Sequence, residues 1–185
     1  MSLENILLGI LKRPAAGYDI KRQFETVFNH FWHADLTQIY RALNRMEKDG
    51  LLESRLEPSE RGPARKVYRR TPAGSRTLAE WLRGGPVLGN EKFAYLAQIH
   101  FLDEIEPAQA EEFFDTLREE LVTQLSTLDA IEQEWRTEAG EGFPDTLDDE
   151  DFHTWLTLDM GLRKTRALVE WVEASIARLR GRRER

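Results

Sequence analysis

The sequence predicts a mainly α-helical protein with a small β-hairpin, divided into two domains. Three observations lead to this prediction. Apolar residues repeat at helical spacing through most of the 185 residues, and the spacing changes to that of strands between positions 52 and 70. Residues 1–83 carry 15 Lys and Arg against 10 Asp and Glu, whereas residues 84–185 carry 11 against 23. Because the charge changes sign, we expect the two halves to have different tasks.

The first fifty residues predict three short helices, each with apolar residues three and four positions apart. Asp35 and Gln38 have the spacing of a capping box, which predicts that the third helix begins there. Gly50 is the glycine expected directly after its end. The three helices are predicted over residues 2–12, 18–29 and 35–49.

The next residues predict a hairpin and a fourth helix. Residues 52–56 and 66–70 have the spacing of short strands, and the polar loop between them is rich in Pro and Gly. Thr71 followed by Pro72 predicts the start of a helix. This order of elements is that of a winged helix-turn-helix over residues 1–83, and residues 84–90 are the expected linker.

Residues 91–185 predict helices alone, and we expect a dimerisation domain there. An acidic connector, residues 138–151, separates a helix over 108–137 from one over about 150–180. The last helix would be about 45 Å long, and it carries two apolar stripes, which need two partners. We predict a homodimer, with a three-helix bundle inside one chain as the alternative. The predicted dimer interface consists of Trp155, Leu158, Leu162, Val169, Val172 and Ile176.

The outward face of the third helix predicts contact with double-stranded DNA. Arg can bind guanine in the major groove, Asn and Gln can bind adenine, and Thr can contact the thymine methyl group. An ordinary solvated helix face would normally include acids, but residues 36–46 contain none. The predicted DNA-binding residues of this helix are Thr37, Gln38, Tyr40, Arg41, Asn44, Arg45 and Lys48.

The hairpin loop carries further cations that suit phosphate groups. Arg61, Arg65 and Lys66 lie on or next to the predicted tip. The alternative is a solubilising loop, since Glu57 and Glu60 lie beside them. Next to the third helix, we predict that these cations contact the DNA backbone.

Several anchors in register resemble the PadR family of bacterial transcriptional regulators. They include Leu7-Leu8-Gly9, Gly17-Tyr18-Asp19-Ile20 and Gly50-Leu51-Leu52, and the resemblance covers residues 3–83. The C-terminal half is similar to the longer domain of the subgroup of phenolic-acid regulators and virulence activators. The resemblance implies that Tyr18 and Tyr40 lie near DNA, and that the protein is a ligand-responsive repressor acting as a dimer on an inverted repeat. Many relatives have Pro where this chain has Arg41, so base preference does not carry over.

Other functions find less support in the sequence. His30, His33 and Asp35 fall within six residues, but the two histidines span a predicted loop and have neither a Glu base nor a third ligand at convincing spacing. We therefore predict no metal and no cofactor. No arrangement typical of an enzyme can be singled out. A protein-interaction adaptor built on a winged-helix scaffold is the alternative function.

Composition sets the broad class. With 41% hydrophobic and 32% charged residues, the chain can bury a core and stay in solution. The absence of cysteine excludes disulfides and thiolate metal sites. No apolar run reaches the ~18–20 residues that span a bilayer, and the start lacks the layout of a signal peptide. We therefore expect a cytoplasmic protein with no membrane partner. A small aromatic effector could bind among Trp81, Phe93, Tyr95 and Trp155, for which packing in a core is the alternative.

Overall fold

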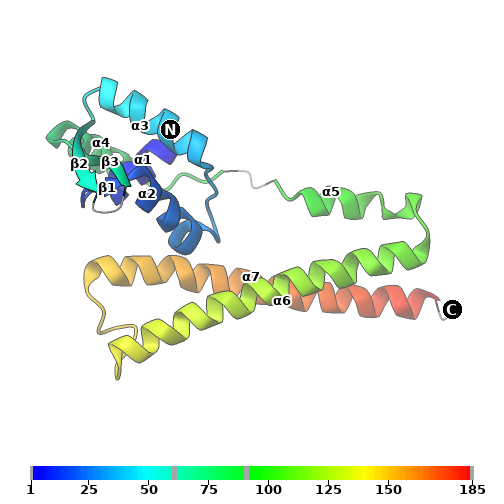
Figure 1. The fold of residues 1–185 in the computed structure, drawn as a ribbon. Coiled ribbons are helices and arrows are strands. Elements are labelled where there is room, and N and C mark those ends of the chain that lie inside the picture. The colour runs from blue at the N-terminus through cyan, green and yellow to red at the C-terminus, as the bar shows by residue number, and fades with distance from the viewer. Residues whose placement is uncertain (1, 60–61, 90–91, 184–185) are drawn as a thin grey trace. The chain divides into compact units, whose positions relative to one another are not determined.

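The computed structural model describes residues 2–59, 62–89 and 92–183, and the chain divides into two compact units, residues 1–90 and 91–185 (Figure 1). The predicted fold class is confirmed, because helices dominate and one small sheet lies in the N-terminal unit. Within the described residues, no helix is both long and apolar enough to cross a membrane. The elements of the N-terminal unit are α1 (Ser2–Ile10), β1 (Ala15–Ala16), α2 (Gly17–Gln23), a π-helical turn (Phe24–Phe28), α3 (Leu36–Lys48), β2 (Leu52–Ser59), β3 (Gly62–Arg70) and α4 (Pro72–Arg83).

The sheet is larger than the predicted hairpin. The two-residue strand β1 pairs antiparallel with β3, so the strand order is β1-β3-β2. The strands β2 and β3 also extend to Ser59 and Gly62, where a long loop was expected. The ladder has an irregularity around Pro58, which cannot donate a ladder hydrogen bond. Because β2 is an edge strand, the hairpin tolerates that proline and continues past it.

The core of the N-terminal unit joins the first three helices to the sheet. Leu7 and Leu8 of α1, Ile20 of α2, and Ile39 and Leu43 of α3 are all fully buried. On α3, the apolar face that the spacing predicted is therefore the face that packs inward. Its opposite face is left to solvent.

The start of α4 closes the unit around the beginning of β2. Thr71 accepts a hydrogen bond from the Gly74 backbone, as a helix cap does, and its hydroxyl donates to the carbonyl of Leu51 at 3.1 Å. A Cβ on Gly74 would lie 2.3 Å from the Leu51 carbonyl oxygen and 2.9 Å from Leu8 Cδ2. Only glycine allows this close approach between α4 and the strand.

The C-terminal unit is built on two long antiparallel helices that lie side by side (Figure 1). Ion pairs join Arg166 to Asp129 and Arg180 to Glu111, each at 2.5 Å, and both pairs run from one long helix to the other. With 33 and 35 residues, each helix is about 50 Å long. Two short helical pieces precede them. The elements are α5 (Ala94–His100), a 3-10 turn (Leu102–Glu104), α6 (Pro107–Ala139) and α7 (Asp149–Arg183).

The apolar stripe of α7 packs inside the same chain, which corrects the predicted dimer interface. Val172 and Ile176 pack in one cluster with residues of α6, and Leu158 and Leu162 pack in a second one. All four are at most 5% exposed, because α6 supplies the partner that was assigned to a second chain. Trp155 and Val169, the other two residues of that stripe, are half-buried.

Candidate nucleic-acid interface

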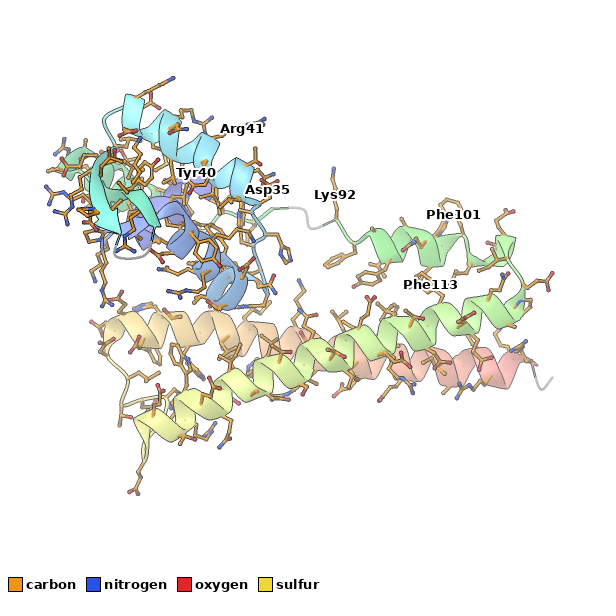
Figure 2. The ribbon with its side chains drawn as sticks, in the orientation of Figure 1. Asp35, Tyr40, Arg41, Lys92, Phe101 and Phe113 are labelled. Carbon is orange, nitrogen blue, oxygen red and sulfur yellow. The ribbon has the colours of Figure 1, made fainter. Side chains whose placement is uncertain are left out.

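The recognition surface begins at the cap of α3. Asp35 accepts a hydrogen bond from the Gln38 backbone at 2.8 Å, and the Gln38 side chain accepts one from the Asp35 backbone at 3.2 Å. This reciprocal pair is the predicted capping box. Because its amide oxygen serves the cap, Gln38 has less to offer a base than the sequence suggested. Asp35, Tyr40 and Arg41 follow one another along the first half of the helix (Figure 2).

The exposed face of α3 is centred on four residues spaced four, three and four positions apart. Residues at this spacing line up along one side of a helix. All four are exposed, and none of them makes an ion pair or a side-chain hydrogen bond with another described residue. Two of these side chains are cations and two are small and polar. We call this group the reading face: Thr37, Arg41, Asn44 and Lys48.

The flank of α3 beside α1 carries a cation that is already paired. Arg45 is exposed, but its guanidinium forms an ion pair with Glu4 of α1. The Glu4 side chain is only 19% exposed, so the pair is partly shielded from water. Any contact of Arg45 with DNA would therefore compete with Glu4, whereas Arg41 has no such competitor among the described residues.

The opposite flank of α3 lies against α2 and the sheet. A Cβ on Gly17 would lie 2.5 Å from the Tyr40 ring, so the absence of a side chain at Gly17 lets the ring pass over the start of α2. Tyr40 remains 39% exposed, and the neighbouring Tyr18 is 73% exposed. Two phenol groups thus border this flank, and a phenol hydroxyl can donate to a phosphate oxygen.

The hairpin, which we call the wing, offers fewer unpaired cations than the sequence suggested. Arg65 is exposed but lies 3.6 Å from Glu57 and 3.9 Å from Asp19. Lys66 is paired with Glu47 of α3 at 2.6 Å. Arg61, the third predicted cation of the wing, lies outside the described residues.

The Glu47–Lys66 pair shifts the pKa values of both of its members. Hydrogen bonds from Lys66 and Ser54 lower the pKa of the Glu47 carboxyl group below its ordinary value. The hydrogen bond to Glu47 raises the pKa of the Lys66 amine in turn. Burial raises the pKa of the Tyr68 hydroxyl next to them. A Glu on α3 and a Lys on the wing were the available signal, but their pairing depends on the strand register.

Within the C-terminal unit, the aromatic residues considered for an effector do not form one group. In the C-terminal unit, Phe93 and Tyr95 have ring centroids 5.7 Å apart, and Tyr95 lies 6.4 Å from Trp171. Trp155 instead packs near the turn between α6 and α7, with Phe143 and Phe152. Trp81 belongs to the N-terminal unit. Among the described residues, no group of three His, Asp or Glu is arranged to hold a metal ion.

Two family profiles match the two halves of the chain. The profile of the transcriptional regulator PadR-like family matches residues 6–80, and the virulence activator alpha C-term profile matches residues 92–180. Among curated proteins, the negative transcriptional regulator PadR of Bacillus subtilis is 24% identical over 177 residues. The match covers 95% of this chain and 96% of that protein.

Solved structures agree with the profiles over nearly the whole chain. The structure of Bacillus subtilis PadR in complex with operator DNA has a TM-score of 0.80 at 25% identity, covering 97% of this chain and 99% of that one. The complex of the same PadR with p-coumaric acid has a TM-score of 0.75 at 25% identity, with the same coverage. The virulence activator AphA of Vibrio cholerae has a TM-score of 0.74 at 27% identity, covering 97% and 98%. The chain belongs to the PadR-like family of transcriptional regulators, as its sequence anchors predicted.

Proposed function

We propose that this regulator is a sequence-specific repressor that binds operator DNA as a homodimer. The observation that carries the proposal is the reading face of α3, which is exposed, free of acids and unpaired with the other described residues. The complex of Bacillus subtilis PadR with operator DNA supports it, because that chain has the same fold over nearly its full length. Family members are transcriptional regulators and not enzymes.

In the proposed complex, α3 lies in the major groove of each half-site. Arg41 and Asn44 would bind base edges, Thr37 would contact a thymine methyl group, and Lys48 would bind a phosphate. Tyr18 and Arg65 would contact the backbone on either side. Because the proposed target is genomic DNA, the proposed location is the cytoplasm.

A second copy of the chain accounts for apolar side chains that the C-terminal unit leaves uncovered. Two helices form a single layer, and a layer with apolar residues on both sides needs a further layer to bury them. Six large apolar side chains of this unit are at least 43% exposed, and two of them, Leu156 and Met160, lie one turn apart on α7. We propose that these surfaces meet in a twofold dimer, which would place two reading faces about 34 Å apart on one duplex. The six exposed residues are Leu96, Phe101, Ile105, Val122, Leu156 and Met160.

We further propose that a small aromatic effector weakens DNA binding through the C-terminal unit. The structure of Bacillus subtilis PadR with p-coumaric acid supports an effector of this class. The rings of Phe93, Tyr95 and Trp171 form a chain in which neighbouring centroids are at most 6.4 Å apart. Adding p-coumaric acid to the protein–DNA complex should raise the Kd for DNA by about 5–150-fold, which is the usual size of such coupling. An unchanged Kd at millimolar acid would contradict a response to this compound.

Selection of bound duplexes from a random pool tests the function itself. We expect a motif of two inverted half-sites about one helical turn apart. With ~6–10 phosphate contacts per dimer, the affinity should fall by about 10³–10⁵ between 50 and 200 mM salt. A flat salt dependence, or a pool that stays random, would contradict the proposal and favour a protein-interaction adaptor.

A further inference from the structure

One carboxylate of α3 binds both strands of the wing. Glu47 Oε2 accepts a hydrogen bond from Lys66 Nζ of β3 at 2.6 Å, and Glu47 Oε1 accepts one from Ser54 Oγ of β2. The Lys66 ammonium also lies 5.0 Å from the centre of the Tyr68 ring. The side chains of Lys66 and Glu47 are 39% and 31% exposed, so water surrounds the pair in part. We call Glu47, Ser54 and Lys66 the clamp.

The clamp lies where the buried part of the wing ends. Leu52 and Tyr68, at the base of the hairpin, are each 2% exposed. Two residues closer to the tip than Tyr68, Lys66 lies opposite Leu56 in the ladder, and Leu56 is 73% exposed. No described side chain at positions 53–58 or 64–66 is buried. Beyond its base, the described part of the wing therefore has no apolar packing that would fix its direction. Two polar contacts tie it to the helices there: the clamp, which joins it to α3, and the longer Arg65–Asp19 ion pair at 3.9 Å, which joins it to α2.

The geometry of the hairpin makes the clamp important for binding. Gly62 lies six positions before Tyr68 on β3, which at about 3.3 Å per residue corresponds to roughly 20 Å of strand. A tilt of about 10° at the base would move the tip by roughly 3 Å, which is the length of a hydrogen bond. Contacts of the wing with a DNA backbone can form together with those of α3 only if the angle between wing and helix is fixed.

We propose that Glu47 is a positioning residue for DNA recognition: through the clamp it fixes the angle between the wing and α3. This inference rests on the proposed function. It assigns Lys66 to a contact within the protein, in place of the DNA contact that the sequence suggested. The lowered pKa of Glu47 and the raised pKa of Lys66 agree with a formed pair.

A purely electrostatic role makes the opposite prediction. If Glu47 were simply an acid near the duplex, its removal would strengthen binding to every DNA sequence. If Lys66 were a phosphate contact, its removal would weaken binding to every sequence and reduce the salt slope by about 0.9. Whether the removal of Glu47 weakens or strengthens DNA binding therefore separates the positioning role from the purely electrostatic one.

The test compares Glu47→Gln, Lys66→Met and the double variant with the unaltered protein. The matched control is Glu53→Gln, which removes a wing acid paired with Arg69 on the other face of the hairpin. Fluorescence anisotropy gives the Kd for the duplex that the unaltered protein selects and for an unrelated duplex of equal length, over a salt series. Hydrogen exchange of residues 64–70 without DNA reports the order of the wing. Lys66→Met carries the test if Glu47→Gln does not fold.

We expect each clamp variant to weaken binding to the selected duplex by about two- to fivefold per subunit, the effect of one partly exposed pair. Binding to the unrelated duplex should weaken less than binding to the selected duplex, Glu47→Gln and Lys66→Met should have the same salt slope, and exchange in the wing should become faster. The double variant should bind no more weakly than the weaker single variant, because both changes break the same contact. The control should behave like the unaltered protein.

Tighter binding of Glu47→Gln to both duplexes would overturn the inference, and so would additive losses in the double variant. A smaller salt slope for Lys66→Met than for Glu47→Gln would do the same, because it would mark Lys66 as a phosphate contact. Failure of the unaltered protein to select any sequence would instead refute the proposed function. The two failures are therefore distinguishable.

Discussion

The difference between Arg41 and Arg45 gives the sharpest prediction about the interface. Both are exposed arginines on α3 and are four residues apart, so they are close in local environment and helix position. Arg45 is paired with Glu4, whereas Arg41 makes no ion pair with another described residue. We expect Arg41→Ala to remove recognition of one base pair per half-site. Arg45→Ala should change base preference little.

The size of the effect follows from the contact that Arg41 can make. A bidentate contact with guanine contributes about 1–3 kcal/mol of discrimination, which is roughly 5–150-fold in Kd. Two subunits would double this free energy on a symmetric duplex. Because position 41 is exposed and Ala favours helices, the free energy of unfolding should change by less than about 0.5 kcal/mol. The loss would therefore belong to binding and not to folding.

The assay measures Kd by fluorescence anisotropy on the selected duplex and on duplexes with each half-site position changed in turn. For Arg41→Ala, the selected duplex should bind more weakly, and one position in each half-site should lose its preference. Chemical denaturation of both variants controls for folding. An equal loss of affinity on all duplexes would make Arg41 a phosphate contact and refute the reasoning. A greater loss of preference in Arg45→Ala would refute the distinction between paired and unpaired arginines.

Further predictions concern packing, ionisation and assembly. Gly74→Ala should lower the free energy of unfolding by about 1–3 kcal/mol because its Cβ would lie 2.3 Å from the Leu51 carbonyl oxygen. The control Gly9→Ala, in α1 with nothing within 4 Å of its Cβ, should raise it by about 0.5–1 kcal/mol, and denaturation curves with the opposite order would contradict this packing. Since its pKa is lowered, Glu47 stabilises the fold at neutral pH and loses this contribution as the pH falls through the lowered pKa. An NMR titration should place its midpoint below the ordinary ~4.3, and a midpoint above that value would show that the pair is absent in solution. Met160, at 61% exposed, belongs to the proposed dimer surface, so Met160→Glu should lower the mass found by light scattering toward that of one chain; an unchanged dimer would place the interface elsewhere.

Local signals in the sequence were sufficient to predict much of the candidate nucleic-acid interface. The capping box at Asp35 and Gln38 fixed the start of α3, and the spacing of Ile39, Leu43 and Met46 fixed its buried face. Once those residues face inward, the helix period determines which residues face outward. Exposure of the predicted reading residues therefore followed from the sequence.

Long-range pairing could not be predicted in the same way. The pair Glu47–Lys66 depends on strand register, and the pair Arg45–Glu4 depends on how α1 crosses α3. The heptad stripe of α7 indicated an apolar partner, but the spacing is identical for a partner in the same chain and one in a second chain. Only the structure identified α6 as that partner for Val172 and its neighbours.

Methylation interference tests most directly whether α3 reads the major groove. Dimethyl sulfate modifies guanine N7, which faces the major groove, and adenine N3, which faces the minor groove. On the selected duplex, methylated guanines should block binding at symmetric positions in two half-sites about 10 base pairs apart, and Arg41→Ala should abolish the interference at one of them. Interference confined to adenine N3, or no interference at guanine N7, would contradict recognition through the exposed face of α3.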